Sequence, residues 1–157
     1  PLYHFLPTHM NRNETVLGEA LKFALDGGNV DFTATSDMEH PQTCEAIMHL
    51  VEAGVPLDRI TVSSDAGGSS PLFDAEGHLL DVKITTPEDF LKQFLRLVDL
   101  MGPEKAISVF STNPAQRLGL GKKGKIAPGL DADLLVFDNE WNLKRVIAKG
   151  RPIWGTI

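Results

Sequence analysis

The sequence predicts an α/β fold, in which a parallel sheet with helices is followed by a small all-β part. Strand-like apolar runs alternate with helix-like periodic segments over the first 120 residues, and the connections between them are short. From residue 124 onward, short apolar runs are separated only by turns. The first pattern is typical of a parallel sheet, and the second is typical of an all-β module.

The first predicted unit is a strand followed by a helix. Residues 3–6 are expected to form a short strand, and residues 8–12 form the loop that leaves it. Apolar residues then recur at helical spacing over residues 16–25, which indicates a helix. Gly27 and Gly28 follow after one further residue and are expected to end that helix.

Two further strands are predicted on either side of a second helix. Residues 29–35 alternate between apolar and polar side chains, which indicates a strand. Residues 43–53 are expected to form a helix that ends at Gly54. The β-branched run at residues 60–62 is typical of a buried strand, and Asp65 follows its carboxyl end.

The rest of the chain is predicted to change from helices to strands. A loop is expected after Asp65 as far as residue 86. Three helices are predicted next, at residues 87–101, 103–110 and 112–119, and three strands after them, at residues 134–137, 143–149 and 151–154. Gly150 separates the last two strands, which indicates a hairpin.

The composition and net charge indicate which kind of partner and which cellular location to expect. The chain has 157 residues, 42% of them hydrophobic and 23% charged, and a net charge of -6. This charge gives no reason to expect nucleic acid or an anionic membrane as a partner, so we expect a small molecule. The single cysteine excludes an intrachain disulfide and is consistent with a cytoplasmic location. The chain begins inside a predicted strand, so we expect it to be a segment of a longer protein.

Two potential metal ligands stand at strand ends. His9 follows the first predicted strand and Asp65 follows the third. The carboxyl ends of parallel strands meet at one edge of a sheet, where imidazole and carboxylate groups commonly bind zinc. A carboxylate there is also able to take a proton from a water molecule. The alternatives are a hydrogen-bonded loop histidine and an aspartate that only forms a turn.

Two further residues near these ends are candidates for substrate binding. Arg12 is able to bind a carboxylate with two parallel hydrogen bonds, and the Ser69 hydroxyl is able to add another. The alternatives are a surface cation and a hydroxyl that serves the turn. Asp37 and His40 follow the second strand and either line the same edge or belong to a solvated loop.

Four stretches resemble one enzyme family. Residues 113–120 (NPAQRLGL) and 123–138 (KGKIAPGLDADLLVFD) resemble the C-terminal signature of the amidohydrolase superfamily. Within it, residues 6–12 (LPTHMNR) and 62–69 (VSSDAGGS) resemble the isoaspartyl dipeptidases, and the likeness extends over essentially the whole chain.

The resemblance implies a (β/α)8 TIM barrel with two Zn2+ ions that cleaves the isopeptide bond of β-aspartyl dipeptides. Residues 1–120 would be the C-terminal part of the barrel, with its last three strands. Residues 121–157 would be part of a small β-sandwich domain. The other zinc ligands, including a bridging carboxylated lysine, would lie in an N-terminal portion of the same protein. A homo-oligomer is also implied.

The resemblance assigns a role to each candidate residue. His9 would match the metal-binding histidine at the end of strand six, and Asp65 the strand-eight aspartate, which binds a metal and transfers protons. Arg12 and Ser69 would match residues that bind the substrate. This segment alone is then expected to be inactive. The alternatives are a dihydroorotase-like or deaminase-like amidohydrolase and a non-catalytic fragment.

Overall fold

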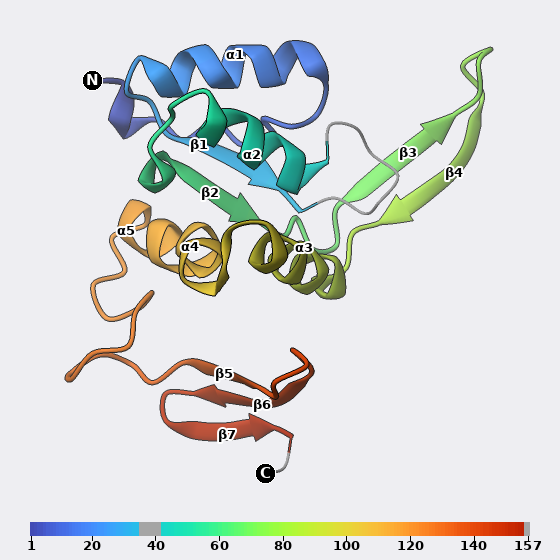
Figure 1. Ribbon diagram of the computed structural model, residues 1–157. Coiled ribbons are helices and arrows are strands. Elements are labelled where there is room, and N and C mark those ends of the chain that lie inside the picture. The colour runs from blue at the N-terminus through green and yellow to red at the C-terminus, as the bar shows by residue number, and fades with distance from the viewer. Residues whose placement is uncertain (35–41, 156–157) are drawn as a thin grey trace. The chain divides into compact units, whose positions relative to one another are not determined.

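A computed structural model describes residues 1–34 and 42–155 (Figure 1). The chain divides into two compact units, residues 1–110 and residues 111–157. Helices and strands alternate in the first unit, which confirms the predicted α/β class. No helix within the described residues is both long and apolar enough to cross a membrane. The assignment of residues 1–120 and 121–157 to a barrel and a sandwich domain stays a prediction.

A parallel pair of strands forms the centre of the first unit. Strands β1 (Val30–Thr33) and β2 (Ile60–Ser63) are paired in parallel, as predicted. Helices α1 (Glu14–Leu25) and α2 (Thr43–Glu52) pack on β1, and α3 (Pro87–Met101) packs on α2. The apolar side chains of the two strands are almost fully buried, so the sheet and these helices share one core.

The expected strand at residues 3–6 is not formed. Leu2–His4 is instead a 3-10 turn, η1, and the chain runs beside β1 only from Pro7 onward. The Asp31 N–H donates to the Pro7 carbonyl at 2.9 Å, and the Met10 N–H donates to the Asp31 carbonyl at 3.2 Å. Pro7 has no N–H to donate to a ladder, so regular pairing does not extend through it. Residues 7–10, here called the His9 segment, therefore form an irregular third member of the sheet.

The loop expected between Asp65 and residue 86 contains a β-hairpin. Strands β3 (Ser69–Phe73) and β4 (Leu79–Ile84) pair antiparallel and extend away from the helices (Figure 1). The Asp74 carboxylate accepts hydrogen bonds from the N–H groups of Glu76 and His78 and so forms the turn. The prediction of a loop is therefore wrong for residues 69–84, and the aspartate-led turn between β-prone residues is the sequence signal that it overlooked.

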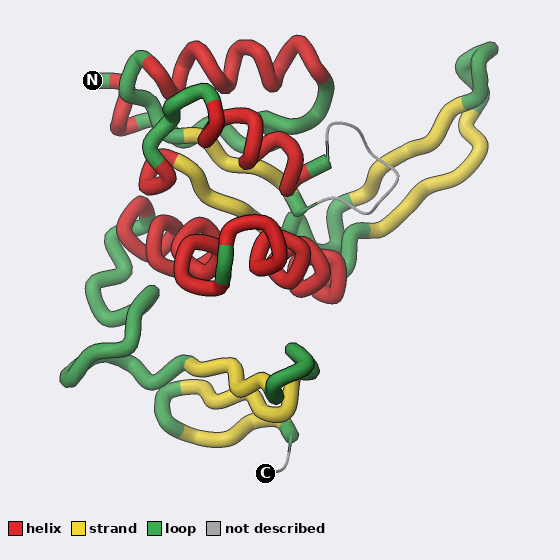
Figure 2. Tube along the Cα trace, in the orientation of Figure 1, coloured by secondary structure: helices red, strands yellow, loops and turns green. Residues whose placement is uncertain are grey.

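The predicted helices after residue 102 are parts of one helical stretch (Figure 2). Helix α4 (Pro103–Ile107) continues through a π-helical turn, η3 (Ser108–Thr112), into α5 (Asn113–Arg117). Pro114 has no N–H to give the hydrogen bond that a continuous α-helix needs there, which is consistent with the wider turn before it. The predicted break near residue 111 is therefore a change of helix type.

The second unit contains the three strands that the sequence predicts. Strands β5 (Leu134–Phe137), β6 (Leu143–Ala148) and β7 (Arg151–Trp154) form an antiparallel sheet in that order. Lys123 forms ion pairs with Asp131, at 3.0 Å, and with Asp133. Asp133 also accepts a hydrogen bond from the N–H of Lys149. These contacts connect the turn before β5 to the β6–β7 hairpin.

Replacing Leu97 on α3 with alanine is expected to destabilise the protein. This side chain is fully buried, and its removal leaves a cavity in the core. We expect a loss of about 2–5 kcal/mol in the free energy of unfolding, measured by urea denaturation. Leu100→Ala is the matched control, because Leu100 is 48% exposed on the same helix. Equal losses in the two variants would contradict the packing described for α3.

Candidate metal and substrate site

His9 and Asp65 lie at the same edge of the parallel sheet. His9 belongs to the segment beside β1, and Asp65 follows the end of β2 by two residues. Both have a left-handed backbone, with φ of 58° at His9 and 45° at Asp65. This conformation costs free energy for residues other than glycine and is often found at functional sites. Both side chains are therefore displayed from sharp turns at the carboxyl edge.

Thr33 at the end of β1 orients the His9 ring. Its hydroxyl oxygen lies 2.8 Å from His9 Nδ1, and the imidazole is half-buried. When Nδ1 carries the proton and donates it to Thr33, Nε2 has a free lone pair for a metal ion. The sequence analysis did not identify Thr33, since nothing in its local pattern distinguishes it from other strand threonines.

Gly68 leaves room for the Asp65 carboxylate. The Gly68 N–H donates to the Asp65 carbonyl at 2.8 Å. A Cβ atom on Gly68 would lie 2.4 Å from Asp65 Oδ2 and 2.8 Å from the Asp65 carbonyl oxygen, so any larger residue would displace this turn. The Asp65 side chain is exposed and available to a ligand.

Arg12 and Ser69 are close in sequence to the two candidate ligands. The Arg12 N–H donates to the His9 carbonyl at 3.0 Å, so both residues belong to one turn. Ser69 opens β3 and pairs with Ile84. Both side chains are exposed at the surface. Their convergence on one substrate stays a prediction.

Asn11 fixes the turn between His9 and Arg12 to the sheet. Its side-chain oxygen accepts the Thr33 N–H at 3.0 Å, and its amide nitrogen donates to the Thr33 carbonyl at 3.0 Å. Asn11 is only 3% exposed, so these bonds are shielded from water. The side chain thus replaces a backbone partner at the end of β1.

Asn11→Ala is expected to destabilise the protein by about 1–3 kcal/mol, because the buried N–H of Thr33 loses its acceptor. Asn11→Asp keeps an acceptor for that N–H but replaces the donating amide with a carboxylate oxygen beside the buried Thr33 carbonyl, so its midpoint in urea denaturation should also lie clearly below that of the unchanged protein. An Asn11→Ala variant as stable as the unchanged protein would contradict this role.

The described residues supply two candidate metal ligands, which is fewer than zinc needs. Zinc in proteins usually has three or four protein ligands. No group of three or more His, Cys, Asp or Glu side chains in residues 1–34 and 42–155 is arranged to hold a metal. Asp37 and His40, the other candidates at this edge, lie outside those residues. His9 and Asp65 fit a zinc site only as part of a larger ligand set.

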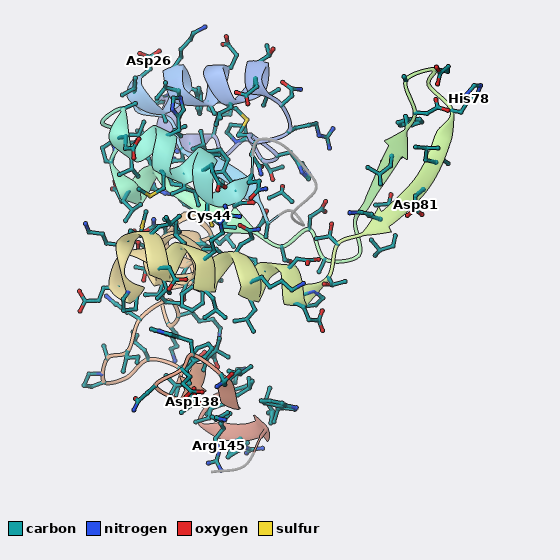
Figure 3. All side chains as sticks on the ribbon, turned by 45° about the vertical axis from the view of Figure 1, so that its right-hand side comes forward. Asp26, Cys44, His78, Asp81, Asp138 and Arg145 are labelled. Atoms are coloured by element: carbon teal, nitrogen blue, oxygen red, sulfur yellow. The ribbon has the colours of Figure 1, made fainter. Side chains whose placement is uncertain are left out.

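Cys44 takes no part in this site. It belongs to α2 and its sulfur faces α3, where it donates to the Gln93 side-chain oxygen at 3.1 Å (Figure 3). Burial raises the pKa of Cys44 to about 12, so the thiol is protonated at neutral pH. The reactive form of cysteine is the thiolate, and the Cys44 side chain is also fully buried, so it is not placed to act as a nucleophile.

Comparisons with known proteins give one family and several relatives. The sequence model described as "Amidohydrolase family" matches residues 4–153. The structure is similar to that of a β-aspartyl dipeptidase from Fervidobacterium islandicum AW-1 in complex with a β-Asp-Leu dipeptide. The TM-score is 0.87 and the identity 32%, over 99% of this chain and 40% of that one.

Two other similarities are weaker. An adenine deaminase from Methanothrix thermoacetophila is 26% identical over 168 residues, which cover 98% of this chain and 29% of that protein. The structure of an N-acetylglucosamine-6-phosphate deacetylase from Thermotoga maritima gives a TM-score of 0.67 at 20% identity, over 96% of this chain and 47% of that one. The latter likeness concerns the fold alone. The chain spans less than half the length of each of these three proteins.

Proposed function

This chain belongs to the amidohydrolase family, and from this we propose that it is the C-terminal part of a zinc-dependent isoaspartyl dipeptidase. The reaction is hydrolysis of the isopeptide bond in β-aspartyl dipeptides. The observation that carries the proposal is the likeness to a β-aspartyl dipeptidase with a bound β-Asp-Leu dipeptide, over 99% of this chain. In this proposal, residues 1–120 contribute the last three strands of a TIM barrel and residues 121–157 contribute to a small β-sandwich domain.

In the proposed enzyme, His9 Nε2 and the Asp65 carboxylate are zinc ligands. Bound zinc supplies a nucleophile at neutral pH and polarises the scissile carbonyl. Asp65 accepts a proton from the attacking water and delivers it to the departing amine. The turns that hold both residues support this assignment, because each presents its side chain at the carboxyl edge of the sheet.

Arg12 and Ser69 bind the substrate in the proposed enzyme. The Arg12 guanidinium pairs with a substrate carboxylate through two hydrogen bonds, and the Ser69 hydroxyl donates a further one. Because the β-linkage displaces the carboxylates relative to an ordinary peptide, this pairing is able to distinguish the two. The exposure of both side chains supports a role in binding.

The proposal includes the partners of this chain. An N-terminal portion of the same protein provides the remaining zinc ligands, among them a carboxylated lysine that bridges the two ions. The enzyme is a cytoplasmic homo-oligomer. This chain covers 40% of the β-aspartyl dipeptidase, which supports the existence of an N-terminal portion.

Incubating the zinc-loaded full-length protein with β-Asp-Leu, α-Asp-Leu and adenine tests the function. We expect cleavage of β-Asp-Leu alone. Deamination of adenine without cleavage of the dipeptide would favour the deaminase, which the 26% identical relative supports. A folded, zinc-loaded protein without activity on any of these substrates would instead favour a non-catalytic role.

A further inference from the structure

Asp31 on β1 is a buried carboxylate with three hydroxyl donors. Its Oδ2 atom accepts hydrogen bonds from Thr8, at 2.8 Å, and Ser63, at 2.6 Å, and its Oδ1 atom accepts one from Thr61 at 2.6 Å. Asp31 is only 6% exposed. A buried carboxylate is costly unless hydrogen bonds replace its hydration, and the three hydroxyl groups do so here.

The two donors to Oδ2 come from the two sides of β1. Thr8 immediately precedes His9 in the His9 segment, and Ser63 ends β2 two residues before Asp65. One oxygen atom therefore connects the two chain segments that carry the candidate metal ligands. The donor to Oδ1, Thr61, also lies on β2, but it is four residues before Asp65 and so is farther along the chain from a candidate metal ligand than Thr8 or Ser63.

We propose that Asp31 is a positioning residue, whose Oδ2 atom fixes the distance between the segments that present His9 and Asp65. The inference rests on the proposed zinc site. Metal ligands need tight placement, and replacing the groups that orient them typically costs about 10–100-fold in metal affinity or activity. Asp31 binds neither metal nor substrate and acts through Thr8 and Ser63.

Replacing Thr8 and Thr61 separately with valine in the full-length enzyme tests this role. Each change exchanges a hydroxyl for a methyl group of similar size and removes one donor from the same carboxylate. Thr8 is exposed, whereas Thr61 is 2% exposed, so Thr61→Val is expected to lower the Tm more. Zinc affinity is measured by adding zinc to the metal-free protein in competition with a chelator. In contrast to the Tm, the zinc affinity is expected to fall more in Thr8→Val than in Thr61→Val.

We expect Thr8→Val to weaken zinc binding by about tenfold or more and Thr61→Val by less than about threefold. Thr8→Ser restores the hydroxyl and should return the affinity to within about threefold of the original. Ser63→Ala removes the other Oδ2 donor and should lower kcat more than it raises KM for β-Asp-Leu. The inference would be overturned if the two valine variants bound zinc equally weakly. It would also be overturned if the variant with the lower Tm were the one with the weaker zinc binding.

The readouts separate this inference from the proposed function. If Thr8→Val leaves zinc affinity unchanged in an enzyme that cleaves β-Asp-Leu, the positioning role fails and the function stands. If the protein cleaves no β-aspartyl dipeptide but loses zinc affinity in Thr8→Val, the function fails and the positioning role is supported.

Discussion

Asp65→Asn in the full-length enzyme is expected to lower kcat for β-Asp-Leu by about 10³-fold or more, with a much smaller change in KM. In the proposed mechanism Asp65 both binds zinc and transfers a proton. A positioned acid or base alone contributes about 10²–10⁴-fold. The asparagine keeps the size of the side chain but neither carries the negative charge nor accepts a proton.

Asp26→Asn is the matched control for this variant. Asp26 is the C-terminal cap of α1 and is exposed on the first unit, before the start of β1 (Figure 3). The same chemical change at that position should leave kcat within about twofold. Near-normal turnover in Asp65→Asn, with zinc content confirmed, would contradict the role of Asp65.

Arg12→Lys is expected to lower kcat/KM for β-Asp-Leu by about 10–100-fold, the cost of losing one hydrogen bond between charged groups. Lysine keeps the positive charge but lacks the planar fork that holds both oxygens of a carboxylate. In the proposed role, Arg12 therefore needs the planar shape of its guanidinium group as well as its positive charge to bind the substrate carboxylate.

A comparison of substrates identifies the group that Arg12 binds. The two carboxylates of β-Asp-Leu are replaced by amides one at a time, and each dipeptide is tested with both enzymes. The Arg12→Lys penalty should largely disappear for the amide that replaces the recognised carboxylate. An equal penalty on all these substrates would indicate that Arg12 supports the turn rather than the substrate.

Local patterns predict the part of the fold that carries the site. The β-branched run before Asp65 and the alternation around Phe32 correctly identify β1 and β2, and helical periodicity identifies α1, α2 and α3. The first segment was predicted wrongly because its apolar residues resemble a strand, whereas Pro7 prevents regular pairing. The β3–β4 hairpin was missed because its residues are exposed on β4 and do not show the pattern of a buried strand.

The candidate ligands are predictable from sequence, but the residues that orient them are not. Asp65 follows a correctly predicted strand, and the chain order places it at the carboxyl edge of the sheet. The strand predicted before His9 is not formed, and His9 reaches the same edge through the irregular His9 segment beside β1. Thr8 and Ser63 meet Asp31 across 23 and 32 residues of chain, and only the paired strands bring them together. A single sequence has no local pattern that marks such contacts.

Anomalous X-ray diffraction at the zinc edge, from crystals of the full-length protein, shows directly whether His9 and Asp65 bind zinc. We expect one anomalous peak at about 2.0–2.2 Å from both His9 Nε2 and the Asp65 carboxylate, or two peaks, one at this distance from each of the two residues. Zinc bound elsewhere, with His9 and Asp65 both free of metal, would contradict it.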